Sequence, residues 1–396
     1  MTGRRALVSG ASIAGLSAAW WLARSGWSVT VLERAPQFRD GGQNVDVRGV
    51  AREVLDRMGL VQAVKAMNTT ETGTVFVDES GRVTAELPTG PEGATAELEV
   101  LRGDFARILL DALPPGVEVL YDQRITAVVD GAAQGQGVAV TTASGRELRA
   151  DLLVVAEGVR SSTRGLLFDE HEVELHDLGV AMAFGTIPRT PDDDDRWRWL
   201  TTTGGRQVHL RPDPHGTTRA ILAVAGEGSL AELDRSEVVA RLRELFEDAG
   251  WESRRVLEGF ETSEDVYVDD LTQVRMPTWS RGRAVLAGDA AWCVTPMGGG
   301  GASLALTSGY VLAAQLSTAP DTATALRAYE DWMRPLVDEV QHLPPGITTF
   351  AYPRTRLGLA ARRVADRVIT SGPLEPLTAK LTRVASSDRP LPQLVA

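Results

Sequence analysis

Short apolar runs alternate with a helical spacing of apolar residues at the start of the chain. Residues 6–8 form one apolar run and residues 29–32 form another, and the stretch between them has the periodicity of a helix that begins near Ile13. Gly26 closes that stretch, and glycine suits the left-handed conformation at a helix end. The pattern therefore predicts a βαβ unit over residues 4–34.

Farther along, the apolar positions change between a period of two, typical of strands, and the longer period of helices. A hairpin is expected over residues 72–87, and residues 176–227 are rich in short strands. We expect further helices over residues 50–67, 103–113 and 235–249, and further strands near 117–121, 125–129, 137–142, 146–154 and 283–288. Helices dominate from Ser303 onward, with an interruption at Pro344-Pro345-Gly346.

Segments with the βα pattern of nucleotide-binding proteins occur at three separated places, and the strand-rich part lies between the second and the third. The sequence therefore predicts an α/β fold with a doubly wound, Rossmann-like domain and an inserted β-sheet domain. The expected limits are residues 1–71, 98–175 and 270–330 for the nucleotide-binding domain, 72–97 and 176–269 for the inserted sheet, and 331–396 for a C-terminal helical segment.

Composition narrows the classes of partner. The net charge of −12 argues against nucleic acid and anionic membranes, because an acidic surface is repelled by both. Cys293 is the single cysteine, so neither an intrachain disulfide nor a cysteine-based metal site is expected. The first residues carry no signal-peptide pattern, and no apolar run reaches the roughly 20 residues that span a bilayer. We expect a soluble cytoplasmic protein, either a monomer or a homodimer.

The turn after the first apolar run carries the first candidate chemistry. Gly10 permits a sharp strand-to-helix turn, Gly15 lets the helix pack against the strand, and backbone amides at the helix start attract a pyrophosphate. Ser12 stands where the dinucleotide fingerprint has its second glycine, and its hydroxyl can donate to a phosphate oxygen instead. Glu33 ends the second strand, where a carboxylate accepts from a ribose hydroxyl and repels a 2′-phosphate. The turn therefore predicts a dinucleotide other than NADP.

Two later segments have related patterns. Residues 151–164 read DLLVVAEGVRSSTR, an apolar strand that ends at Glu157-Gly158. Residues 285–303 read VLAGDAAWCVTPMGGGGAS, a strand that ends at Gly288-Asp289 and is followed by Pro296 and a run of glycines that opens a helix. Two strand ends and a glycine-rich helix start would bring an acid and bare amides to one crevice, which is the usual ligand position in an open α/β sheet.

With these motifs in this order, the chain resembles the single-component, class A FAD-dependent aromatic hydroxylases related to p-hydroxybenzoate hydroxylase, and especially the tetracycline-inactivating branch. The resemblance implies a glutathione-reductase-type FAD-binding domain. It also implies a monooxygenase of secondary metabolism in which NADH or NADPH reduces FAD and O2 adds to the flavin as a C4a-hydroperoxide. The substrate that the resemblance implies is an aromatic or polyketide-like small molecule, which is hydroxylated.

The resemblance assigns FAD contacts residue by residue. The first turn and the carboxylate after it hold the ADP half, Arg34 lies near the adenosine, Arg102 contacts the phosphate region, and Asp289 binds the ribityl or pyrophosphate part. The polyglycine turn lies against the isoalloxazine, with helix-start amides near N1 and O2. Pro296 and Met297 border the flavin, and no separate catalytic residue is implied. The implied cofactor contacts are Gly10, Ser12, Ile13, Ala14, Gly15, Glu33, Arg34, Arg102, Asp289, Gly298, Gly299, Gly300, Gly301, Ala302 and Ser303.

Several positions depart from the family pattern. Glu157 stands where aspartate is usual, Trp292 where histidine is frequent, and Ser303 where asparagine is usual. None of these changes removes a group that FAD binding requires, whereas contacts that also serve the nicotinamide are expected to shift.

The inserted sheet offers the candidate substrate residues, among which Met182 shares a strand face with Phe184, and Trp197 with Trp199, by the period of two. They are Met182, Phe184, Trp197, Trp199, His209 and Arg219. These residues form either ordinary sheet packing or an aromatic box for a planar polycyclic substrate. Parity alone leaves open which face of the sheet looks at the flavin.

Other functions stay open at this point. A flavin-dependent dehydrogenase or reductase uses the same fold without oxygen insertion, and a non-catalytic FAD-binding protein is a third class. The stretch Trp197-Arg198-Trp199 is similar to the paired tryptophans of flavin-dependent halogenases, but neither Lys65 nor Lys380 has the position of a catalytic lysine. No metal is expected, because no metal-ligand spacing joins the histidines, which are His171, His176, His209, His215 and His342.

Overall fold

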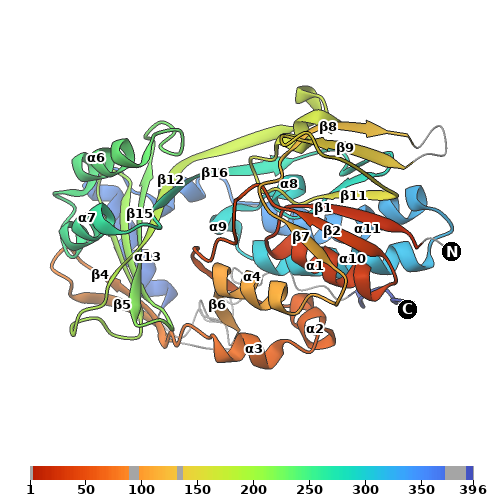
Figure 1. Cartoon of the computed structure of the whole chain (residues 1–396). Helices are drawn as coiled ribbons and strands as arrows, with labels where there is room; N and C mark the ends of the chain where they lie inside the picture. Colours follow the sequence, from red (N-terminus) through yellow and green to blue (C-terminus); the bar gives the residue numbers. More distant parts are fainter. Residues whose placement is uncertain (1–2, 89–97, 132–136, 371–388, 396) are drawn as a thin grey trace.

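The computed structural model describes residues 3–88, 98–131, 137–370 and 389–395 (Figure 1). Parts of all three expected units lie outside the described residues: 1–2 and 132–136 of the nucleotide-binding domain, 89–97 of the inserted sheet, and 371–388 and 396 of the C-terminal helical segment. Within the described ranges, no helix is both long enough and apolar enough to cross a bilayer. The α/β fold class is confirmed, with the chain arranged around two large sheets.

One sheet has six strands in the order β17-β18-β11-β1-β2-β7. All neighbours pair in parallel except β17 with β18. The apolar strands β1, β11 and β18 are almost completely buried, as expected for a parallel sheet that is covered on both faces. The bounds are β17 Ser280–Arg281, β18 Ala284–Leu286, β11 Leu152–Val155, β1 Arg5–Ser9, β2 Ser28–Leu32 and β7 Glu118–Leu120.

Helices α1 (Ile13–Arg24) and α10 (Gly301–Thr318) pack closely against one another beside this sheet. Gly309 makes this approach possible, because a Cβ there would lie only 2.5 Å from the backbone nitrogen of Ala18. The Ser17 hydroxyl donates to the carbonyl of Leu306 at 2.6 Å, which ties the two helices together. Their relative position is therefore fixed, and with it the position of both helix N-termini.

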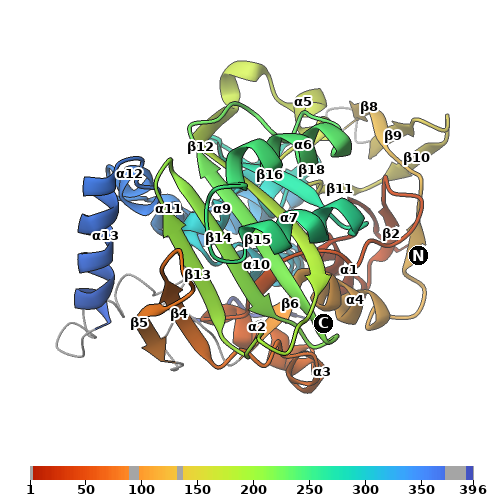
Figure 2. The same cartoon turned by 90° about the vertical axis from the view of Figure 1, so that its left-hand side faces the viewer.

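The other sheet has seven strands in the order β16-β12-β15-β14-β13-β4-β5. Figure 2 looks onto this sheet, with helices α6 (Arg235–Phe246) and α7 (Ser253–Thr262) lying across one of its faces. The strands β12 and β16 are long, and in Figure 1 they run from this sheet toward the six-stranded one. The bounds are β16 Tyr267–Arg275, β12 Glu174–Pro188, β15 Thr217–Ala225, β14 Arg206–Pro212, β13 Trp197–Thr202, β4 Gly73–Val77 and β5 Val83–Pro88.

Smaller elements surround the two sheets. Strands β3 and β6 pair with each other, and β8, β9 and β10 form an antiparallel ribbon. The strand bounds are β3 Asn44–Asp46, β6 Glu99–Leu101, β8 Ile125–Asp130, β9 Val138–Thr142 and β10 Glu147–Ala150. The remaining helices are α2 Val50–Arg57, α3 Val61–Ala66, α4 Arg102–Asp111, α5 Ser162–Leu167, α8 Asp289–Trp292, α9 Thr295–Gly298, α11 Thr322–Gln341, α12 Ile347–Ala351 and α13 Arg356–Ile369.

Some expected elements differ in detail from the observed ones. The helix expected over residues 50–67 is two helices, because Gly59 adopts a φ of +73° and ends the first of them. The single strand expected over residues 146–154 is β10 and β11, which are separated by Asp151. The expected domain limits near residues 175, 269 and 330 fall inside or at the ends of β12, β16 and α11, and the division into domains stays a prediction.

Candidate active site

The three sequence motifs meet at one edge of the six-stranded sheet. Ser9, the last residue of β1, lies beside Val155 of β11, which in turn lies beside Leu286 of β18. The glycine-containing turns after these strands are therefore neighbours. Gly10 has a φ of +106°, and a side chain there would clash with the carbonyl oxygen of Ala156 in the adjacent turn. The close approach explains why glycine is required at this point.

The first turn leaves the N-terminus of α1 open. Ser12 is the N-cap residue and is exposed, and within the described residues its side chain makes no capping hydrogen bond. Glu33 lies beside the turn, with Oε2 accepting from the amide of Ala11 at 2.9 Å and Oε1 from the amide of Ala35 at 2.8 Å. Arg34 is exposed next to it. This arrangement combines open helix amides, which attract a phosphate, with a fixed carboxylate that can accept from a ribose.

Glu157 of the middle motif accepts four hydrogen bonds. Its Oε1 accepts from the hydroxyls of Ser9 (2.5 Å) and Thr163 (2.6 Å), and its Oε2 accepts from the hydroxyl of Ser161 (2.7 Å) and the amide of Thr163 (3.0 Å). The side chain therefore joins the end of β1 to the start of α5. With glutamate rather than aspartate at this position, the additional methylene carries the carboxylate toward the neighbouring strand.

Arg164 joins the middle motif to the third one. Its Nη1 donates to the carbonyl of Ala290 in α8 at 3.0 Å, and its Nη2 donates to the carbonyl of Val159 at 2.8 Å. The side chain is buried, and this desolvation lowers the pKa of the guanidinium from its usual value. All three motifs are therefore held together by specific polar contacts as well as by the sheet.

A group of charges lies where the third motif faces β16. Asp289 begins α8 and is exposed, yet protein surrounds it closely, and this desolvation raises the pKa of its carboxyl while the charge of Arg102 opposes the rise. Desolvation also raises the pKa of Asp269 in β16 to about 6, and the neighbouring Asp289 adds to the effect. The positive charge of Arg102, which is exposed at the start of α4, opposes the rise in the pKa of both carboxyls.

The polyglycine segment forms the turn before α10. Gly299 and Gly300 have φ values of 70° and 69°, which favour glycine, and α10 begins without an acidic residue in its first turn. The Ser303 hydroxyl donates to the carbonyl of Asp46 at 2.9 Å and accepts from the amide of Arg48 at 3.0 Å. Ser303 thus joins α10 to β3, and its hydroxyl has both its hydrogen-bond donor and its acceptor partner within the protein.

The other positions of the third motif lie in different surroundings. Trp292 is 2% exposed and packs against Trp279 with ring centroids 4.4 Å apart, so it belongs to the core rather than to an open site. Pro296 is exposed in α9. Met297 packs against the seven-stranded sheet, next to Met182 and its neighbours. The segment after α8 therefore spans the space between the two sheets.

The face of the seven-stranded sheet that carries the candidate substrate residues lies opposite α6 and α7. Val208 and Leu210 of β14 pack under these helices, so the alternate residue His209 points to the other side. The pairing registers continue this second face across the sheet, from Phe76 through Trp199, His209, Ile221 and Phe184 to Tyr267. Met182, Trp197 and Arg219 have the same parity in their strands. All six candidate substrate residues therefore share one face.

The aromatic residues on this face stack on one another. The ring centroids of Trp197 and Trp199 are 5.0 Å apart, and those of Trp199 and His209 are 4.4 Å apart. Trp197 Nε1 donates to His209 Nδ1 at 3.2 Å, so Nε2 carries the ring proton and donates to Gln207 Oε1 at 3.1 Å. Burial lowers the pKa of His209 to about 3, and the ring is neutral at ordinary pH. These rings form a packed layer, and Gln207 connects it to α12 by donating to the carbonyl of Ala351.

A small pocket lies beside this layer, between the segment at residues 42–44 and strands β12 and β15. Phe184, Arg219, Ile221 and Tyr267 line it from the sheet side. Phe184 and Tyr267 stack with centroids 5.0 Å apart, and the Tyr267 hydroxyl donates to Gln43 Oε1. The pocket therefore brings two of the candidate substrate residues together with the segment that precedes β3.

Several residues of this region were missed by the sequence analysis. Tyr267 and Asp269 alternate in YVDDLTQVR, so the period of two contained a signal for them. Glu71 and Glu99 carried no local signal, because their shared partner is Arg211, more than a hundred residues away in the chain. Only the folded sheet shows that these carboxyls reach the face that carries the candidate substrate residues.

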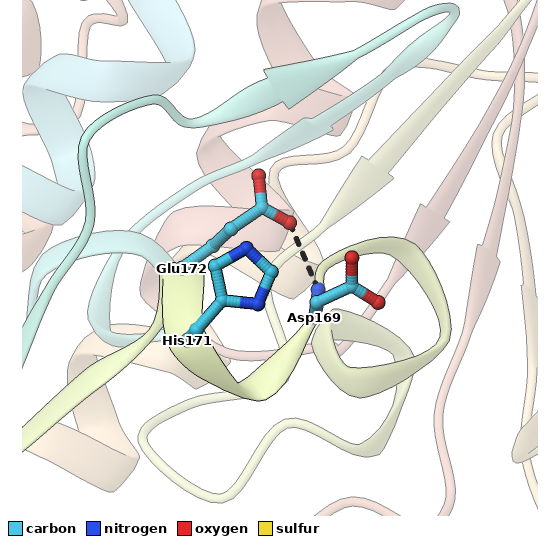
Figure 3. Close-up of side chains that lie close together, drawn as sticks. All are labelled: Asp169, His171 and Glu172. Carbon is cyan, nitrogen blue, oxygen red and sulfur yellow. Dashed lines mark hydrogen bonds between the residues drawn. The ribbon is translucent and has the colours of Figure 1, made fainter.

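Figure 3 shows a separate group of polar side chains, Asp169, His171 and Glu172, whose possible ligand atoms lie within 4.8 Å of one another. The dashed contact in the figure is a capping interaction, in which the amide of Asp169 donates to Glu172 Oε2 at 2.9 Å. Arg281 also binds Glu172, and Asp169 and His171 are exposed. These contacts account for the cluster as a capped turn, and we assign no metal to it.

Comparisons with known proteins agree with this geometry. The family described as "FAD binding domain" matches residues 4–342. An uncharacterised protein of Mycobacterium tuberculosis (strain ATCC 25618 / H37Rv) is 37% identical over 80% of this chain and 85% of its own length. The flavin-dependent monooxygenase eupH of Phoma sp is 34% identical, covering 91% of this chain and 90% of its own. The crystal structure of tetracycline destructase Tet(51) superposes with a TM-score of 0.82 at 28% identity, covering 98% of this chain and all of that one.

Proposed function

The chain belongs to the FAD-binding family and is an FAD-dependent monooxygenase, and we propose that NADH or NADPH supplies its electrons and that an aromatic or polyketide-like small molecule is its substrate. The observation that carries the proposal is the meeting of three separated sequence motifs at the carboxyl ends of adjacent parallel strands. Two helix N-termini without acidic residues in their first turns adjoin the same place. An anionic cofactor with a pyrophosphate and an electron-rich ring fits such a donor set.

Each part of this donor set has a proposed role. The amides at the start of α1 hold the pyrophosphate, and Glu33 accepts from a ribose hydroxyl. Arg102 and Asp289 lie beside the phosphate and ribityl region, and the start of α10 lies against the isoalloxazine. When bound, FAD supplies the redox chemistry, which is the acceptance of a hydride and the activation of O2. The positive end of α10 stabilises negative charge on the pyrimidine edge of the ring.

The seven-stranded sheet has the proposed role of orienting the substrate. Its face between Phe76 and Tyr267 carries aromatic rings, and Met297 of α9 packs against this face. The neutral His209 is not a proton donor at neutral pH, because its pKa is about 3. Its proposed role is to orient Trp197 and Gln207 through its two ring nitrogens. The sheet and α9 together keep water from the reacting atoms.

The proposal is tested on purified protein that has been saturated with FAD. Phenolic bicycles and polycycles are screened for faster NADH or NADPH oxidation, and products formed under ¹⁸O₂ are examined by mass spectrometry. Incorporation of one labelled atom per product supports the monooxygenase. A dehydrogenase or reductase would change the substrate without label, and a halogenase would require halide for turnover. Failure of FAD to bind would refute the proposal altogether.

A further inference from the structure

The arginines that reach the aromatic face of the seven-stranded sheet already have acidic partners. Arg211 Nε donates to Glu71 Oε2 at 2.9 Å, and its Nη2 donates to Glu99 Oε1. The guanidinium lies 4.0 Å from the ring centroid of Trp197, so an indole covers its flat face while two carboxyls take its polar edge. Arg211 is 9% exposed and both carboxyls are buried. The guanidinium of Arg211 is therefore paired with carboxyls and covered by an aromatic ring within the protein.

Arg219 is paired in the same way at the other side of the face. Its Nε donates to Asp213 Oδ2 at 3.0 Å, and its Nη1 donates to Asp265 Oδ2 at 3.1 Å and to the Thr186 hydroxyl at 2.6 Å. Desolvation opposes ionisation of both aspartates, but hydrogen bonds outweigh it, from Thr217 to Asp213 and from Ser263 and Thr186 to Asp265. With a smaller contribution from the charge of Arg219, they keep both pKa values below their usual range, so both aspartates are ionised at neutral pH. Although Arg219 lines the small pocket, its positive charge is more than compensated.

Arg362 approaches the face from α13. Its Nε donates to Asp366 Oδ1 at 2.7 Å, and its guanidinium lies over the rings of Phe76 and Trp199 at 5.9 Å and 5.8 Å from their centroids. Both partners of this ion pair are buried. The third cation on this face is therefore also neutralised by a carboxyl of its own helix.

Each cation on the face has carboxyl partners. The three guanidinium groups have five of them, and burial raises the pKa of Glu99 to about 8, so Glu99 accepts a hydrogen bond from Arg211 without adding a negative charge at neutral pH. Of the arginines on the flavin side, Arg48 pairs with Asp46 at 3.0 Å, and Arg102 stands near Asp269 and Asp289. Within the described part of the chain, the face presents no uncompensated cation to a substrate.

Buried acceptor atoms without hydrogen-bond partners also favour a ligand that carries donors rather than a carboxylate. Asn44 lines the small pocket and donates from Nδ2 to Glu99 Oε1 at 2.7 Å. The proton of Glu99 lies on Oε2, because Oε1 already accepts from Arg211 and Asn44. Among the described residues, Asn44 Oδ1 and Glu71 Oε1 are buried acceptor atoms without a hydrogen-bond partner. Such atoms are satisfied by a donor, such as a hydroxyl or an amide N–H, and they are repelled by a second carboxylate.

Building on the proposed function, we propose that the substrate is an uncharged aromatic ring system bearing hydroxyl or amide donors, and that carboxylate-bearing aromatics are rejected by the paired arginines of this face. An entering carboxylate would lose its hydration and meet only cations that are already neutralised. A neutral ring meets aromatic surfaces on which it can stack. The selection is therefore electrostatic, and it is set by Glu71, Asp213, Asp265 and Asp366.

The test uses FAD-loaded protein and two matched pairs of ligands at pH 7.5. These are 4-hydroxybenzamide with 4-hydroxybenzoate, and 6-hydroxy-2-naphthamide with 6-hydroxy-2-naphthoate. Dissociation constants are measured from the change in the flavin absorbance spectrum, and flavin-independent equilibrium dialysis checks them. The carboxylate of each pair is expected to bind at least about tenfold more weakly than the amide, because a tenfold change corresponds to only ~1.4 kcal/mol.

Variants that release one arginine are expected to reverse this preference in part. Glu71→Gln keeps an acceptor for Arg211 but removes a negative charge, and Asp265→Asn does the same for Arg219. Each should strengthen carboxylate binding about fivefold or more, and Asp265→Asn should change amide binding less than about twofold. The matched control is Asp248→Asn, because Asp248 pairs with Arg206, which lies in β14 with the parity of the opposite face. This variant should leave the ratio unchanged.

The outcomes separate this inference from the proposed function. Equal or tighter binding of the carboxylates by the unaltered protein overturns the inference while leaving the monooxygenase intact. A binding ratio that stays constant in both releasing variants, each shown by circular dichroism to be folded, also overturns it. If no ligand of either pair binds to FAD-loaded protein, the aromatic substrate site is refuted, and with it both proposals.

Discussion

Replacing Glu157 by alanine removes a carboxylate that accepts four hydrogen bonds where the strands β1 and β11 end. The hydroxyls of Ser9 and Ser161 can turn toward other acceptors, but the amide of Thr163 is fixed in α5 and loses its charged partner. An unsatisfied buried amide costs about 1–3 kcal/mol, and loss of the remaining charge-assisted bonds brings the expected destabilisation to about 3 kcal/mol.

The expected change in melting temperature follows from the size of the chain. At about 2.1 cal/mol/K per residue, 396 residues give an unfolding entropy of roughly 0.8 kcal/mol/K, so a loss of about 3 kcal/mol lowers Tm by roughly 4 °C. The Glu157→Gln variant should lose only about 1 kcal/mol. Its carbonyl oxygen can accept from the Thr163 amide, while its NH2 group donates to the Ser9 and Thr163 hydroxyls.

Thermal unfolding of the FAD-loaded protein, followed by circular dichroism and by release of flavin fluorescence, measures both variants. The FAD dissociation constant should rise at least about tenfold for the alanine variant, because the turns after β1 and β11 lose their common anchor, and by less than about twofold for the glutamine variant. Glu147→Ala, an exposed position in β10, is the control. Equal effects of alanine and glutamine, or no effect of alanine, would refute the reasoning that these hydrogen bonds hold the turns together.

Three further changes have distinct expected results. Gly10→Ala should abolish FAD retention during gel filtration, because its Cβ would clash with the carbonyl of Ala156 at a φ of +106°. Gly309→Ala should force α10 away from the backbone of Ser17 and lower stability by about 1–3 kcal/mol in urea unfolding. Burial raises the pKa of Glu99 from 4.5 to about 8, so protons bind the folded protein more tightly, and the free energy of unfolding should fall as pH rises through that window. Urea midpoints at pH 5.5 and 8.5 should differ less in Glu99→Gln than in the unaltered protein.

Features that depend on neighbouring residues were predictable from the sequence. A parallel strand buried on both faces requires a continuous apolar run, and a turn that touches the next turn requires glycine. The strands and turns of residues 6–15, 151–158 and 285–301 could therefore be predicted from the sequence. Alternation in β12, β13 and β14 likewise predicted which side chains share a face. Each of these patterns spans only a few residues, so it can be recognised in the local sequence.

Features that depend on distant partners were not predictable. The inward face of the seven-stranded sheet is decided by α6 and α7, which pack on the other face, and nothing within β12–β14 encodes that choice. The parallel pairing of β13 with β4 joins residues more than a hundred positions apart. Likewise, the position of Glu71 and Glu99 at this face depends on their hydrogen bonds with the distant Arg211. Burial and pairing at this range follow from the whole fold rather than from any one segment.

Alternate residues of β14 lie on opposite faces of the sheet: Val208 and Leu210 pack under the helices, while Gln207, His209 and Arg211 lie on the face that carries the candidate substrate residues. Substitutions of Gln207, His209 and Arg211 can therefore change the side chains on that face, while Val208 and Leu210 keep the packing of the sheet against the helices. A lineage built on this sheet is free to exchange ligands through point mutations, without insertions or a new backbone.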